Sequence, residues 1–271
     1  MLKLLLLYAL SVINPGEMAC IGSIQDTTLP LDIYIAGGEM EGTATLAAQR
    51  QVVYLNGPRL SSLKPGIIHR VVRPEGRVRD PLSGDKLGYY YMDIGTIRIE
   101  TVDQEKAVAS VQVACHGMLK GDLVIPYVPK QKVEFNGALS SELTALPDHG
   151  LVSSILLAKD DVREMGAGNL CFLGLGARDG IKPGDRFTVF RPQPSFDPRD
   201  MDAGGTASDR SYSSMTNYAY RFNLNMLLRQ RKLAPQILGD IVVVEAGENI
   251  STGKIISSLS EIHIGDLIVK R

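Results

Sequence analysis

Histidine, cysteine, serine and paired carboxylates are the side chains most often used for catalysis, and this chain places none of them in a recognisable catalytic pattern. The four histidines are far apart in the sequence, at His69, His116, His149 and His263. There is no nucleophile elbow, no HExxH zinc motif and no phosphate-binding glycine loop. Gly174-Leu175-Gly176 lacks the third glycine of a dinucleotide fingerprint. We therefore predict a protein that is not an enzyme, with no catalytic residue, no cofactor and no metal site.

The acidic residues fit turns better than acid–base or calcium chemistry. Three Gly-Asp pairs, Gly121-Asp122, Gly184-Asp185 and Gly265-Asp266, each precede a segment with strand character. Glycine provides a positive φ and aspartate accepts backbone hydrogen bonds, which is what a tight turn requires. Lys64-Pro65-Gly66-Ile67 lacks the aspartate, and we expect it to form the same turn.

The sequence segments that contain these turns occur twice in the chain. Lys64-Pro65-Gly66 returns 118 residues later as Lys182-Pro183-Gly184, and the flanking blocks keep that offset. Gly121-Asp122 returns 144 residues later as Gly265-Asp266, again together with its neighbours. An internal repeat of this length predicts two similar domains in tandem, with about 26 residues inserted in the second copy.

Each copy alternates apolar and polar residues in short runs that are separated by Gly, Pro and Asp, which is typical of antiparallel strands. The first copy predicts strands at 51–55, 67–73, 96–102, 107–114 and 123–127, and the second at 170–174, 186–191, 241–245, 253–257 and 267–270. A further strand is expected at the start of each copy, at 38–46 and 150–157. We predict a mainly β protein with two tandem small antiparallel β-barrel or sandwich domains. Their expected bounds are 38–128 and 149–271, joined by a linker at 129–148.

The insertion at 196–236 is the part of the second copy without a counterpart in the first. Met215, Tyr218, Phe222 and Met226 recur at helical spacing, and no acid occurs between 211 and 239. We expect an amphipathic helix over Ser214–Leu233. It would be either a lid on the second barrel or a surface that contacts a protein partner or a membrane. The candidate partner-binding residues are Tyr218, Arg221, Phe222, Met226, Arg229 and Arg231.

The N-terminus has the pattern of an export signal. Lys3 precedes an apolar run over Leu4–Ile13, followed by Asn14-Pro15-Gly16. A run of about ten residues is too short to span a bilayer as a helix, so we predict a signal peptide over 1–19 and no transmembrane span. The alternatives are a misplaced start and a buried apolar strand. The expected location is periplasmic or associated with the outer membrane, and Cys20 offers a weak lipoprotein alternative because the residues before it form a poor lipobox.

The other two cysteines stand where the other copy has aliphatic residues. Cys115 matches Leu259 and Cys171 matches Val53. We interpret both as buried thiols that act as small apolar side chains.

Composition limits the partners. The chain has 271 residues, 44% hydrophobic and 22% charged, with a formal net charge of −1 and no Trp. Such a charge balance argues against a nucleic-acid partner, and the length suits two domains with separate cores.

The order of the motifs is similar to that of a known family. The first strand of the pattern ends in VYL in one copy and CFLG in the other, and the turn motif GIKPGD follows it. The motif DP-SG comes next, and the motif I-GD precedes the last strand. This order resembles the C-terminal β domain of flagellar assembly protein T. It also resembles the tandem β domains that follow LysM modules in bacterial cell-envelope proteins. The resemblance covers 38–128 and 149–271, and it implies an exported, non-enzymatic envelope protein. No LysM module is visible, so peptidoglycan binding is not carried over, and the family offers no catalytic residues.

The sequence therefore favours a non-enzymatic, exported bacterial envelope protein with a structural, assembly or binding role. Flagellar and cell-wall association are the processes that the resemblance suggests, and the expected partner is an envelope protein. The alternative is a glycan- or small-molecule-binding hydrolytic protein that uses the inter-domain cleft. That alternative requires His, Asp, Glu and Ser side chains to converge, which the spacing does not favour.

Overall fold

The computed structural model describes residues 10–11, 19–38, 50–130, 134–135, 150–192 and 235–271. The chain divides into two compact units. The first unit comprises residues 13–78 and 86–132, and the second comprises 133–271 together with 1–12 and 79–85. The regular structure of the described residues is almost entirely β-strand, with three short 3-10 turns and no α-helix. The predicted mainly β class is confirmed.

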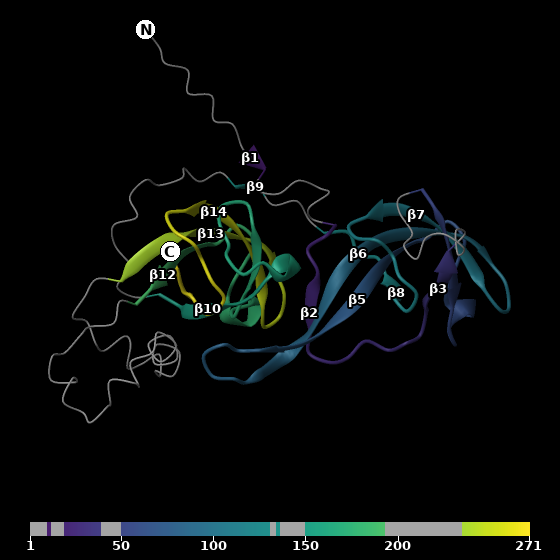
Figure 1. The fold of residues 1–271 in the computed structure, drawn as a ribbon, viewed down its shortest axis with the longest axis horizontal. Helices are drawn as coiled ribbons and strands as arrows, with labels where there is room; N and C mark the ends of the chain where they lie inside the picture. Colours follow the sequence, from purple (N-terminus) through teal and green to yellow (C-terminus); the bar gives the residue numbers. More distant parts are fainter. Residues whose placement is uncertain (1–9, 12–18, 39–49, 131–133, 136–149, 193–234) are drawn as a thin grey trace, which may run out of the picture. The chain divides into compact units, whose positions relative to one another are not determined.

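The second unit contains a closed antiparallel barrel. Six strands pair in the order β10-β11-β14-β13-β12-β15, and β15 pairs back to β10 (Figure 1). These strands are β10 (Val152–Ala158), β11 (Leu170–Leu173), β12 (Arg186–Arg191), β13 (Gln236–Ala246), β14 (Ser251–Ser258) and β15 (Leu267–Lys270). Two short strands, β1 (Leu10–Ser11) and β9 (Glu134–Phe135), pair with each other.

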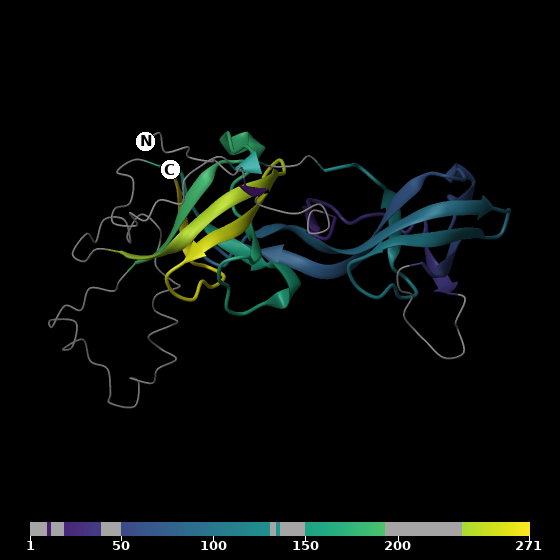
Figure 2. The ribbon, with the colours of Figure 1, turned by 90° about the horizontal axis from the view of Figure 1, so that it is seen from above.

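The first unit contains a seven-stranded antiparallel sheet in the order β2-β6-β5-β8-β3-β4-β7, and β6 also pairs with β7. Six of its strands therefore form a closed circuit of pairings, with β2 added to the edge of β6. Figure 2 shows β5 and β6 as a long two-stranded ribbon, in blue. The strands are β2 (Ser23–Gln25), β3 (Tyr34–Gly38), β4 (Val52–Asn56), β5 (Ile68–Arg79), β6 (Lys86–Val102), β7 (Ala107–Ala114) and β8 (Leu123–Pro126).

Each unit encloses an apolar core built from the inward-facing residues of its strands. In the first unit, alternate residues of β6 such as Ile97 and Ile99 are fully buried, as is Leu55 of β4. In the second unit, Ile241 and Val243 of β13 are fully buried. Burial of aliphatic side chains from strands far apart in the sequence is the main force that closes each sheet.

Each predicted strand overlaps an observed one, although β6 (Lys86–Val102) and β13 (Gln236–Ala246) begin well before the strands predicted at 96–102 and 241–245. The strands expected at 107–114 and 186–191 are β7 and β12, with the same bounds. The strand expected at 38–46 lies earlier in the structure, at Tyr34–Gly38, and residues 39–49 are outside the described part of the chain.

The turn before β5 matches the turn before β12, as expected. Gly66 and Gly184 have φ values of +84° and +94°, which glycine adopts without strain. The amide of Gly66 donates to the carbonyl of Ile99 at 2.7 Å, and that of Gly184 donates to the carbonyl of Val243 at 2.8 Å. Asp185 accepts a hydrogen bond from the amide of Lys182 at 2.9 Å, which confirms its role in the turn.

The amphipathic helix expected over 214–233 lies outside the described residues. Among the residues that the structure describes, no helix has the length and apolar character needed to cross a membrane.

Candidate functional site

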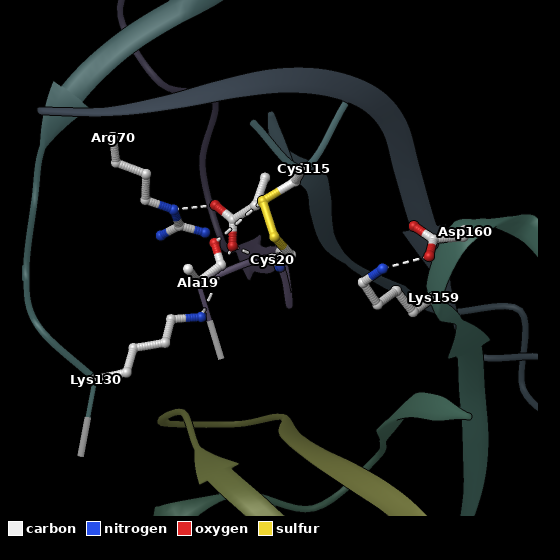
Figure 3. The surroundings of a disulfide bond; sticks show 9 residues. Ala19, Cys20, Arg70, Cys115, Lys130, Lys159 and Asp160 are labelled. Carbon is white, nitrogen blue, oxygen red and sulfur yellow. Dashed lines mark hydrogen bonds and ion pairs between the residues drawn. A yellow bond between two sulfur atoms is a disulfide. The ribbon is translucent and has the colours of Figure 1, made fainter. Parts of the chain in front are cut away.

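A disulfide bond joins Cys20, just before β2, to Cys115, just after β7 (Figure 3). The two cysteines are 95 residues apart in the sequence. The interpretation of Cys115 as a buried thiol is therefore wrong. Alignment with Leu259 suggested an apolar position, but Leu259 is 66% exposed, so the match did not indicate burial. The signal that could have found the bond is the predicted export itself, because exported chains commonly oxidise their cysteines.

The residues after Cys20 are built into the first unit. Ile21 is fully buried, and the amide of Gly22 donates to Oδ2 of Asp93 at 2.7 Å. Gly22 has a φ of +84°, and a Cβ there would lie 2.8 Å from the Tyr90 ring, so only glycine fits. Strand β2 then pairs with β6, with Ser23 opposite Tyr91. The disulfide therefore reinforces a segment that is also held by packing and hydrogen bonds.

Asp93 is the charged centre of this arrangement. Its side chain is fully buried and forms an ion pair with Nε of Arg70, and Nζ of Lys130 lies 3.9 Å from its other oxygen. Arg70 also donates to the hydroxyl of Ser23 at 3.3 Å. Figure 3 shows Arg70 and Lys130 beside the Cys20–Cys115 bond. A buried carboxylate is tolerated only when cations and hydrogen-bond donors compensate it, and here they couple β5 to the N-terminal segment.

A second buried ion pair closes the loop between β7 and β8. Arg73 donates from Nε and Nη2 to the two oxygens of Asp122, at 2.8 and 2.9 Å, and also to the carbonyl of Gly117 at 3.0 Å. Asp122 accepts a further hydrogen bond from the amide of Leu119 at 2.7 Å. Hydrogen bonding to Asp122 raises the pKa of Arg73. Such bidentate pairing fixes geometry as well as charge.

The second unit has the same arrangement before β15. Arg191 donates to both oxygens of Asp266 at 2.8 Å and to the carbonyl of Glu261 at 3.3 Å. The amide of His263 donates to Asp266 at 2.7 Å, and Nδ1 of His263 lies 2.8 Å from Arg191 Nη2. The expectation that these aspartates serve turns is confirmed, but their arginine partners were missed. The available signal was the recurrence of Arg-Pro at Arg73 and Arg191.

The described histidines lie at separate places in the fold. His69 is in β5, His116 follows β7 and His263 precedes β15, while His149 is outside the described residues. Burial lowers the pKa of His69. Among the residues described, no group of three or more His, Cys, Asp or Glu side chains could hold a metal ion.

Cys171 is a free, fully buried cysteine on β11. Burial raises the pKa of its thiol to about 12, which keeps it protonated and unreactive at neutral pH. The prediction that it acts as a small apolar side chain is confirmed. The six candidate partner-binding residues of the insertion, from Tyr218 to Arg231, lie outside the described part of the chain and remain a prediction.

Comparison of the sequence with protein-family models and with curated proteins gave no match. Any function must therefore be argued from the fold, the disulfide and the buried ion pairs.

Proposed function

We propose that this chain is an exported, non-enzymatic protein of the bacterial envelope, which contains two copies of one β unit and a partner-binding insertion in the second copy. The observation that carries the proposal is the Cys20–Cys115 disulfide. Disulfides persist in oxidising compartments such as the periplasm and are rare in the cytosol. The bond agrees with the signal-like pattern of Lys3 followed by Leu4–Ile13.

The strand pairing supports the two-copy proposal. The circuit β3-β4-β7-β6-β5-β8 of the first unit has the same order as β10-β11-β14-β13-β12-β15 of the second. Strands β7 and β14 differ in numbering by 144 at both ends, as do β8 and β15.

Register and irregularities agree as well. In the first unit Ile97 pairs with Val111, and in the second Ile241 pairs with Ile255. Both pairings shift register at two places, after Thr96 and after Ile99 in one case and after Asp240 and after Val243 in the other. Bulges are specific local features, so their coincidence favours one ancestral unit over two unrelated sheets.

The charged residues support a structural rather than a catalytic role. Asp122 and Asp266 each have both oxygens engaged by an arginine and one engaged also by a backbone amide. A carboxylate held in this way is poorly placed to transfer protons. Both units contain this arrangement of an arginine and an aspartate, and the feature that the two units share is the fold. We therefore assign the arrangement to the stability of the fold.

The insertion is the natural place for a binding function, because it is what the second copy has and the first copy lacks. We propose that it forms the amphipathic helix over 214–233 and presents Tyr218, Phe222 and Met226, with the basic residues Arg221, Arg229 and Arg231, to a protein partner in the envelope. Flagellar assembly and cell-wall maintenance are the processes suggested by the family resemblance.

The test replaces residues 198–234 in the full chain with the first-copy turn Pro81-Leu82-Ser83-Gly84. A matched control replaces the same residues with a flexible Gly/Ser linker of equal length, which removes the sequence but keeps the spacing. We expect both variants to keep the β-sheet circular-dichroism spectrum and to lose the partners that the unaltered chain captures by cross-linking in native envelope extract. Retention of every cross-linked partner by both variants would contradict the binding role.

A point variant separates the insertion from general destabilisation. Tyr218→Ala combined with Phe222→Ala removes two large apolar side chains without changing chain length. It should weaken capture of the same partner by at least tenfold, a loss that corresponds to about 1.4 kcal/mol or more. Unchanged capture would place the binding surface elsewhere.

A further inference from the structure

We propose that Cys20 is a substrate of a disulfide-carrying thiol oxidoreductase in the export compartment, which joins it to Cys115, and that Cys20 is not a lipid-attachment site. The inference rests on the proposed export, and it assigns the fate of the cysteine for which the sequence left lipid attachment open.

The same sulfur cannot serve both modifications. A lipoprotein anchor forms a thioether at the cysteine Sγ, and in this structure the Sγ of Cys20 is bonded to that of Cys115. The neighbouring chain also opposes an anchor. Ile21 is fully buried and the Gly22 amide is bonded to Asp93, so no free tether follows Cys20 to let it reach a bilayer.

The pairing is unambiguous because the third cysteine is chemically silent. Thiolates are the attacking species in thiol–disulfide exchange. Cys171 is fully buried, and a thiol pKa of about 12 leaves almost no thiolate at neutral pH. Once the second unit has folded, Cys20 and Cys115 are the only reactive pair among the three cysteines of the chain.

The exchange balances in two steps. The Cys20 thiolate attacks a sulfur of the carrier's disulfide, forms a mixed disulfide and releases one carrier thiolate. The Cys115 thiolate then attacks the Cys20 sulfur, forms the Cys20–Cys115 bond and releases the second carrier thiolate. The chain loses two electrons and two protons, and the carrier leaves as a dithiol.

Asp93 is a positioning residue for the second step. It accepts the Gly22 amide hydrogen bond at 2.7 Å and pairs with Arg70, which itself donates to Ser23. These contacts hold the segment that contains Cys20 against β6. They require no disulfide, so they can bring the two thiols together before the bond forms.

The experiment expresses the full chain in its native host and traps thiols with acid and an alkylating reagent. In the unaltered protein, denaturation followed by alkylation should label only Cys171, and prior reduction should add two further labels. The Cys115→Ser variant should accumulate a mixed disulfide between Cys20 and a carrier protein, visible as a band that disappears on reduction. The Cys171→Ser variant is the control and should oxidise normally.

The Asp93→Asn variant tests positioning by the rate at which reduced, denatured protein forms the bond after transfer to refolding buffer that contains oxidised glutathione, a small disulfide that accepts the two electrons. We expect oxidation at least severalfold slower than in the unaltered chain. Asp266→Asn is the matched control, because it disturbs a buried ion pair of the second unit and should leave the rate unchanged. Oxidation of Asp93→Asn at the unaltered rate would overturn the positioning role.

The outcomes separate this inference from the proposed function. A diacylglyceryl group on Cys20, or a Cys20 that alkylates without reduction in an exported chain, overturns the inference and leaves export intact. If the Cys115→Ser variant forms no mixed disulfide, the proposal that a carrier protein oxidises Cys20 is overturned. A cytoplasmic chain that retains Met1 and both reduced cysteines contradicts the proposed function itself.

Discussion

Arg191 binds both carboxylate oxygens of Asp266 through parallel hydrogen bonds of 2.8 Å, and the pair closes the loop before the last strand of the barrel. Arg73 and Asp122 repeat the arrangement in the first unit. The carboxylate side chains of Asp266 and Asp122 are 6% and 3% exposed, while the arginine side chains that cover them are 34% and 25% exposed. Loss of either arginine should therefore leave a largely buried carboxylate without its bidentate partner and destabilise the unit that contains it.

We expect Asp266→Asn to lower the free energy of unfolding of the second unit by about 2 kcal/mol, because the amide cannot accept from both nitrogens of Arg191. Urea unfolding measures the change. Glu248→Gln is the control, since Arg178 and Glu248 form an exposed pair with side chains 64% and 61% accessible, and surface pairs contribute little. Equal effects from the two substitutions would show that burial of the pair is unimportant.

Replacing both Cys20 and Cys115 with Ala should destabilise the first unit by about 4 kcal/mol. The bond closes a long loop, with 95 residues of sequence separation, and chain entropy predicts the largest gain for such loops. The measurement is urea unfolding followed separately for each unit by hydrogen exchange. The urea midpoint of the second unit should not change. An equal shift of the midpoint in both units would contradict the prediction that the disulfide stabilises only the first unit.

His69→Phe should reduce the dependence of stability on pH. Burial lowers the pKa of His69 in the folded chain, so the unfolded chain binds the proton at higher pH. The free energy of unfolding should therefore fall as pH drops below the ordinary histidine pKa of about 6.5, and it should level off only below the lowered folded value.

Phenylalanine is a suitable replacement because Phe187 holds the corresponding place on β12, where it is fully buried. Urea midpoints between pH 7 and pH 5 should vary less in the His69→Phe variant than in the unaltered chain. Identical slopes would mean that His69 does not contribute to the pH dependence.

Gly95→Ala and Gly239→Ala should destabilise their respective units by about 2–3 kcal/mol each. A Cβ at Gly95 would lie 2.1 Å from the carbonyl oxygen of Val113, and one at Gly239 would lie 2.2 Å from that of Ser257. These contacts are with backbone, so the sheet itself would have to move. Gly166→Ala is the control, because its Cβ would meet only the Ser258 hydroxyl at 3.4 Å, and its thermal midpoint should change by no more than a few degrees.

The strands were predictable because their signal is local. Alternation over 107–114 and punctuation around 186–191 were enough to locate β7 and β12. The Lys-Pro-Gly turns were also predictable, because glycine and proline restrict the backbone within a few residues.

The contacts that close the fold were not predictable in this way. Arg73 reaches Asp122 across 49 residues, and Arg191 reaches Asp266 across 75. Such partners meet only once the order and register of the sheet are known, and alternation within one strand does not specify which strand lies beside it. For the same reason β2 was not predicted, because its three residues form a strand only by pairing with β6.

The proposed two-copy architecture is tested most directly by residue-resolved amide hydrogen exchange on the full oxidised chain. The amide of Ile99 donates to the carbonyl of Ile67 at 3.0 Å, and that of Val243 donates to the carbonyl of Asp185 at 2.9 Å. If the two units share one pairing scheme, the Ile99 and Val243 amides should both be strongly protected, as should those of Gly66 and Gly184. The corresponding amides are those of Ile99 and Val243 and those of Gly66 and Gly184. If one amide of each pair were protected while the other exchanged at the rate of an unfolded chain, the duplication would be contradicted.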